Sequence, residues 1–175
     1  MIVDWQHHWT PEATFEARGG VKGQMTAIKR DGKVSVYLHD NFWDLSRHVA
    51  DMDEAGIDAI WERVERYVNV WGPKFWGCDT ETSPLSKPVR EYFDMAGYEG
   101  GMNAVKCALT LIKPERLLFG TDYPANFPND GQGMRRYIDN IRAIARSKEA
   151  ADNMLGGNAC RLLKIEYKKH ADRES

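Results

Sequence analysis

Two polar residues near the N-terminus and one aspartate far along the chain have the types and the spacing that metal chemistry requires. Gln6 and His8 follow the apolar start of the chain two residues apart, and Asp122 follows the apolar run RLLFGT. Side chains at positions i and i+2 of a strand point to the same face of a sheet. An imidazole nitrogen, an amide oxygen and a carboxylate can each bind a divalent cation. Each of the two stretches is therefore a candidate for metal binding, and Asp122 could also accept a proton from a metal-bound water.

Each of these residues also has a structural interpretation. An aspartate at a strand end often caps the loop that follows, and Gln6 and His8 could be ordinary polar residues at a strand exit. His7 should point away from both. His39 is expected on a loop surface and His48 on a solvated helix face, so neither supplies a further ligand. The predicted set is thus weaker than the three protein ligands plus water of a typical zinc site.

Strands and amphipathic helices alternate around these residues, in the order typical of an α/β fold. The Asp31–Gly32 pair lies between two β-prone runs and predicts a β-hairpin over 25–38. Strands are predicted at 1–4, 57–61 and 116–122. Helical spacing of apolar residues predicts helices at 45–55, 102–112 and 134–145, with Ser147 and Asn158 as N-caps of two further helices.

The middle of the chain is less regular. Residues 62–71 have helical periodicity, and the proline-containing segment 72–88 is predicted to be a loop. A short helix is predicted to begin near Val89, and residues 93–96 are predicted to pass from this helix into a loop.

Composition excludes several classes of partner. The 175 residues are 42% hydrophobic and 29% charged, with a net charge of -2, which is typical of a globular domain. We assign this single domain to 1–165 and a polar tail to 166–175. No basic field is present for nucleic acid or a membrane surface, so a small molecule is the expected partner. Three widely spaced cysteines match no zinc motif and, without a recognisable signal peptide or membrane span, indicate a cytoplasmic protein.

The two ends of the chain together carry motifs of one family. The segments GTDYP, which contains Asp122, and GGNACRLLKI, at 156–165, resemble the closing segments of the amidohydrolase superfamily. Gln6-x-His8 is similar to the His-x-His or Glu-x-His metal pair on the first strand of that superfamily. The chain most resembles the amidohydrolase-related branch that includes aminocarboxymuconate-semialdehyde decarboxylase and the hydroxybenzoate decarboxylases.

This resemblance implies a (β/α)8 barrel and a divalent metal, zinc or manganese, bound by Gln6, His8 and Asp122. It also implies hydrolysis or decarboxylation of a small carboxylic acid, with Asp122 as the acid or base. Phe75 and Trp76 would line the substrate pocket and suit a planar aromatic acid. An aromatic pair that covers the apolar core is an equal alternative for these two residues.

The chain is shorter than a complete barrel, which typically takes about 250 residues. The resemblance covers 1–60 and 62–165, so middle strands are expected to be missing at a join near 60–62, with a smaller loss near 93–96. The predicted fold is α/β, a partial or shortened (β/α)8 TIM-barrel-like fold with an N-terminal β-hairpin insertion. The alternative to an enzyme is a non-catalytic truncated barrel that folds as a homo-oligomer or in a complex with a related full-length chain.

Overall fold

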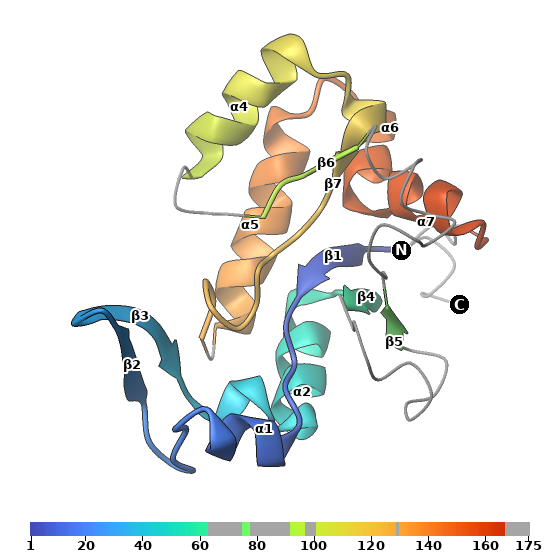
Figure 1. The fold of residues 1–175 in the computed structure, drawn as a ribbon. Helices are drawn as coiled ribbons and strands as arrows, with labels where there is room; N and C mark the ends of the chain where they lie inside the picture. The colour runs from blue at the N-terminus through green and yellow to red at the C-terminus, as the bar shows by residue number, and fades with distance from the viewer. Residues whose placement is uncertain (63–74, 78–91, 97–100, 129, 167–175) are drawn as a thin grey trace.

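The computed structural model describes residues 1–62, 75–77, 92–96, 101–128 and 130–166. Within these residues, short strands lie at the centre and helices pack on them (Figure 1). The central strands are β1 (Val3–His7), β4 (Ala59–Glu62), β5 (Phe75–Gly77), β6 (Phe93–Asp94) and β7 (Leu117–Leu118).

These strands form a parallel arc in the order β6-β7-β1-β4-β5. β1 pairs in parallel with β4 and β4 with β5, while β6 pairs in parallel with β7. The segment after β7 connects the two sets, because the Asp122 N–H donates to the Gln6 carbonyl over 2.8 Å and His7 forms a parallel bridge with Tyr123. In the described part of the chain the arc stays open and no barrel closes.

Helices cover the arc and enclose the core. They are α1 (Glu12–Ala17), α2 (Leu45–Ala55), α4 (Gly101–Leu111), α5 (Gly131–Ile144), α6 (Lys148–Asp152) and α7 (Asn158–Leu163), with helical turns at Asp40–Phe42, Pro114–Arg116 and Asn153–Gly157. Ile138 and Ile141 of α5 pack with Ile57 and Phe119 in the main core, and all four are at least 95% buried. This burial is what holds the amphipathic helices on the strands. In the described residues no helix is long and apolar enough to cross a membrane.

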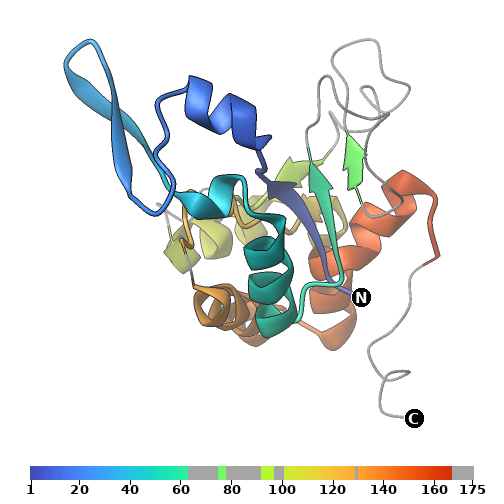
Figure 2. The same ribbon diagram turned by 90° about the horizontal axis from the view of Figure 1, so that it is seen from below.

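The predicted hairpin consists of β2 (Thr26–Arg30) and β3 (Lys33–Leu38), joined by Asp31 and Gly32, which both have positive φ. It projects from the body of the molecule (Figure 2). Ile28 and Val36 on one of its faces pack against a small cluster that contains Phe15. The hairpin itself is confirmed, and its status as an insertion in a barrel stays a prediction.

Helix ends follow the local sequence in most places. Ser147 Oγ accepts a hydrogen bond from the Ala150 N–H over 3.1 Å, as expected of an N-cap. The prediction for Asn158 is wrong, because the turn Asn153–Gly157 runs into α7 without a break. Asn158 is fully buried and instead donates to the carbonyls of Pro114 and Leu117, each over 2.7 Å.

Three further predictions from local pattern are corrected. β1 reaches His7 rather than ending at residue 4, because its pairing with β4 continues to Glu62. Phe93–Asp94 and Phe75–Gly77 form strands rather than loops. In each case aromatic residues with high β propensity pair with a neighbouring strand, and this tertiary pairing outweighs the nearby glycines and prolines. The predictions for 63–71, for most of the loop before 88, for the helix near Val89 and for the tail fall outside the described residues.

Candidate metal centre

The structure brings His8 and Asp122 together at the carboxyl ends of two neighbouring parallel segments. His8 Nε2 lies 2.7 Å from Asp122 Oδ1. The side chain of His8 is 43% exposed and that of Asp122 is 25% exposed, so both remain open to a ligand. Functional side chains of parallel α/β folds gather at this end of the strands. The predicted pairing of these two residues is therefore observed.

The local backbone fixes the direction of the Asp122 carboxylate. Asp122 has a positive φ of 57°, which turns the chain sharply at the end of the apolar run. The turn is closed by the Ala125 N–H, which donates to the Asp122 carbonyl over 2.9 Å. Asn126 Nδ2 donates to Asp122 Oδ2 over 3.2 Å. This contact leaves Oδ1 directed at His8.

Gln6, the third predicted ligand, lies between two carboxylates. With its nitrogen toward Asp122, its amide makes one long hydrogen bond of 3.5 Å to Asp122 Oδ1. In that orientation the amide oxygen faces only acceptors; with the amide reversed, its nitrogen donates to both carboxylate oxygens of Asp94, over 3.1 and 3.2 Å. Reversal replaces one long hydrogen bond to Asp122 with two charge-assisted hydrogen bonds to Asp94 and removes the contact between the Gln6 oxygen and the Asp94 carboxylate, so the reversed orientation is favoured.

Asp94 is a residue of this site that the sequence analysis missed. It ends β6, and the Ala96 N–H donates to its Oδ1 over 3.0 Å. The residue as a whole is exposed, but partial burial of its carboxyl raises the pKa of Asp94, with further contributions from the Asp122 and Asp4 carboxylates. The only sequence signal was an aspartate two residues before an alanine–glycine pair, in a segment that we expected to be a loop.

A glycine allows these strand ends to approach one another. A Cβ atom on Gly120 would lie 3.1 Å from the Gln6 Cβ and 3.2 Å from the Ala96 Cβ. The absence of a side chain at Gly120 therefore lets β1 and β6 close on the segment that carries Asp122.

His7 points away from the site, as predicted, but it is not solvated. It is 1% exposed, its Nδ1 lies 3.1 Å from Asp4 Oδ2, and its Nε2 lies 2.9 Å from His48 Nδ1. The prediction for His48 is wrong, because His48 is also 1% exposed and contacts the Asn41 carbonyl through Nε2. Polar partners on both sides make the buried position of His48 favourable, whereas the neighbouring apolar Val49 is 54% exposed.

The charge state of the histidine pair follows from its contacts. Burial lowers the pKa of His48 to about 3, with the neighbouring His7 as the next largest cause. His48 is therefore neutral near pH 7. Because its Nε2–H must donate to the Asn41 carbonyl, its Nδ1 accepts the hydrogen bond from His7.

Asp4 connects the buried pair of His7 and His48 to the segment after β7. The Thr121 N–H donates to Asp4 Oδ1 over 2.9 Å, and Thr121 Oγ1 donates to Asp4 Oδ2 over 2.5 Å. Tyr123 OH donates to Asp51 Oδ2 over 2.5 Å, which ties the same segment to α2. These contacts fix the backbone of the two segments that carry Gln6, His8 and Asp122.

The prediction for His39 is also wrong. The residue is 7% exposed and its ring packs edge-on against Phe42 at 5.1 Å between centroids. Burial lowers the pKa of His39. The hairpin returns into the body of the protein at this point, so the residue after it is covered rather than exposed.

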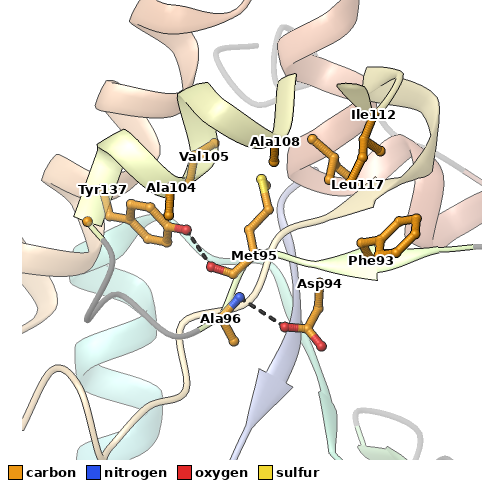
Figure 3. A pocket seen from close by; sticks show the side chains of 11 residues that line it. Phe93, Asp94, Met95, Ala96, Ala104, Val105, Ala108, Ile112, Leu117 and Tyr137 are labelled. Atoms are coloured by element: carbon orange, nitrogen blue, oxygen red, sulfur yellow. Dashed lines mark hydrogen bonds between the residues drawn. The ribbon is translucent and has the colours of Figure 1, made fainter. Parts of the chain in front are cut away.

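An apolar pocket lies on the opposite side of β6, between β6–β7 and the helices α4 and α5. Its wall includes Met95, Val105 and Tyr137, and the Tyr137 hydroxyl donates to the Met95 carbonyl over 2.7 Å. Figure 3 shows the Asp94 carboxylate pointing away from α4. Asp94 is part of the wall of this pocket and also lies beside Gln6 at the strand-end site.

The ligand set of the candidate site contains two strong donors and one amide. In the described ranges no three His, Cys, Asp or Glu side chains group closely enough to bind a metal. A metal held by His8 and Asp122 would therefore need the Gln6 amide oxygen as a third protein ligand. The backbone of Phe75 and Trp76 lies in β5, and the side chains of both fall outside what the structure describes.

Comparison with known proteins identifies the family. The model of the amidohydrolase family matches residues 36–165. The chain belongs to the amidohydrolase family. This is the family that the motifs of the sequence predicted, and the matched range includes Asp94, Asp122 and the closing segment 156–165. Family members have a TIM-barrel-like fold and generally use divalent metals.

One solved structure similar to this amidohydrolase is the 5-carboxyvanillate decarboxylase LigW of Sphingomonas paucimobilis, with 17% sequence identity and a TM-score of 0.36. The likeness covers 93% of this chain and 49% of that enzyme, so the chain spans about half the length of its solved relative. The search of curated proteins gave no match.

Proposed function

We propose that this amidohydrolase is a metal-dependent hydrolase or decarboxylase that acts on a small carboxylic acid, with aromatic acids as the first class to test. One observation carries the proposal: His8 Nε2 and Asp122 Oδ1 lie 2.7 Å apart at the carboxyl ends of adjacent parallel segments. Two metal-binding side chains that are 114 residues apart in sequence meet there.

The residues present suit a divalent cation. His8 would supply the imidazole nitrogen, Asp122 the carboxylate oxygen and Gln6 the amide oxygen. The bound cation, zinc or manganese, would polarise the carboxyl group of the substrate or lower the pKa of a water. Two oxygen ligands and one nitrogen ligand favour manganese among these two metals, because carboxylate and carbonyl ligands suit it.

Asp122 is the residue that would move a proton. In hydrolysis its carboxylate would accept a proton from the attacking water, and in decarboxylation it would deliver one to the carbon that loses CO2. Asn126 would hold Oδ2 during either step through its hydrogen bond of 3.2 Å. Phe75 and Trp76 remain the proposed lining of the substrate site.

The alternative, a non-catalytic remnant that folds only in an assembly, is not favoured. A remnant without activity would have no constraint that keeps His8 and Asp122 partly exposed and in contact at the strand ends. Homo-oligomerisation, or pairing with a related full-length chain, stays a prediction, as does the cytoplasmic location. Both are compatible with an active enzyme.

A substrate screen tests the proposal directly. The full chain, loaded with Mn²⁺ or Zn²⁺, is incubated with a panel of aromatic carboxylic acids and their esters and amides, and CO2 release and hydrolysis are measured. We expect turnover of at least one class, lost by a factor of about 100 or more in Asp122→Asn. The exposed Asp139→Asn on α5 is the matched control. Equal turnover in the Asp122 variant would contradict the role of Asp122.

A further inference from the structure

Asp94 lies at the candidate metal centre without being one of its ligands. It is the last residue of β6, which pairs with β7, and the Ala96 N–H holds its Oδ1 over 3.0 Å (Figure 3). Its nearest polar neighbour across the strand ends is the amide of Gln6, 3.1 and 3.2 Å from its two oxygens. A carboxylate that is already fixed by a backbone N–H can act as a fixed acceptor for that amide.

The orientation of the Gln6 amide decides what it can offer to a cation. An amide has one end that donates and one that accepts, and only the oxygen binds a metal. With the nitrogen on Asp94, the oxygen occupies the position 3.5 Å from Asp122 Oδ1. Two neighbouring oxygen ligands of one divalent cation lie about 3.0 Å apart in octahedral and about 3.4 Å apart in tetrahedral geometry when each bond is about 2.1 Å long. The spacing of Gln6 and Asp122 is therefore suitable for two ligands of one ion.

We propose that Asp94 is a positioning residue of the metal centre, which binds the NH2 group of Gln6 and thereby turns the Gln6 carbonyl oxygen toward Asp122. The inference rests on the proposed function and extends it. It gives a physical reason why a glutamine can stand where the resemblance expects histidine or glutamate. A carboxylate that orients a metal ligand from behind commonly changes metal affinity by 10–100-fold when it is mutated.

Asp94→Asn tests this arrangement, because an asparagine at 94 can donate its own NH2 group to the Gln6 oxygen. The Gln6 nitrogen would then face Asp122. Calorimetric titration of the metal-free full chain with MnCl2 should show an affinity about 10–100-fold lower than that of the parent. Asp139→Asn, an exposed carboxylate on α5, should bind Mn²⁺ as the parent does.

A double variant separates positioning from general damage. In Gln6→Glu/Asp94→Asn, residue 6 has an oxygen at both ends and residue 94 still donates to one of them. We expect Mn²⁺ affinity to return to the parent level or higher. Equal affinity in Asp94→Asn and the parent would overturn the inference while leaving the proposed function intact. Failure of the double variant to recover affinity would also overturn it.

A measurement without metal completes the test. In the NMR spectrum of the 15N-labelled, metal-free chain, the Gln6 side-chain NH2 should show a nuclear Overhauser contact with the Ala96 amide proton, because both donate to Asp94. A contact with Asn126 instead would place the nitrogen on Asp122 and overturn the inference. If the parent chain binds no Mn²⁺, the proposed function fails, and this spectrum still decides the orientation of Gln6.

Discussion

His48 Nδ1 lies 2.9 Å from His7 Nε2, at the back of β1, the strand that carries Gln6 and leads into His8. Both rings are buried, and the neutral His48 also donates a hydrogen bond from its Nε2 to the Asn41 carbonyl. The face of β1 opposite the candidate metal site is thus fixed to α2 by hydrogen bonds. The free energy of unfolding of variants of this pair shows how much these hydrogen bonds stabilise the strand beneath the site.

Replacing His48 by phenylalanine should destabilise the protein by about 1–3 kcal/mol, because a buried His7 nitrogen and the Asn41 carbonyl both lose their partner. The free energy of unfolding is measured by urea denaturation. Val49→Ala is the control, since Val49 is exposed on the same helix. If Val49→Ala lowers the free energy of unfolding as much as His48→Phe does, the loss reflects a general sensitivity of α2 to substitution and not the histidine pair.

The same histidine predicts a pH dependence. Its folded pKa of about 3 lies below its unfolded value, so the unfolded chain binds more protons between these values. Stability from His48 is therefore complete above about pH 6.5 and falls as the pH is lowered toward 3. Urea unfolding at pH 7 and pH 5 should show a smaller difference in His48→Phe than in the parent. An unchanged difference would contradict a neutral buried His48.

Thr121→Val should destabilise the fold by about 1.5–3 kcal/mol, since it removes a hydroxyl donor from the buried Asp4 carboxylate while keeping the side-chain volume. Thermal unfolding followed by circular dichroism gives the change. Thr110→Val on α4 is matched, because the Thr110 hydroxyl is exposed. A shift in the melting temperature no larger than that of Thr110→Val would show that Asp4 does not depend on Thr121.

Gly120→Ala should separate the strand ends of the site. The new methyl group would lie 3.1 Å from the Gln6 Cβ and 3.2 Å from the Ala96 Cβ, and overpacking of this kind costs about 1–3 kcal/mol. We also expect Mn²⁺ affinity to fall, as measured by calorimetry. Ala96→Gly in the same chain removes one of the two clashes and should restore part of the loss. No recovery in the double variant would exclude the contact with Ala96 as the cause.

Features of the site that depend on a local pattern or a short motif could be predicted from the sequence. The apolar run before Asp122 indicated a buried segment that ends in a carboxylate at the strand ends, and the period of two placed Gln6 and His8 on one face, where both lie close to Asp122. The Asp31–Gly32 turn predicted the hairpin. Each of these signals is contained within about ten residues, so no tertiary information was needed.

Features that depend on neighbours distant in sequence could not be predicted. Phe93–Asp94 is only two residues long, and it is a strand because β7 pairs with it. His48 is buried because His7 and Asn41 satisfy its two nitrogens, which a helical period does not reveal. Asp94 was missed for the same reason, since its partner Gln6 lies on another strand.

Metal content per chain tests the central claim most directly. The full chain is purified without a chelator, and its metal is measured by plasma mass spectrometry alongside His8→Ala, Asp122→Ala and the control Asp139→Ala. We predict close to one manganese or zinc ion per chain in the parent and the control, and little in the other two variants. No metal above background in the parent, or equal metal in all four proteins, would contradict the assignment of His8 and Asp122 to a metal centre.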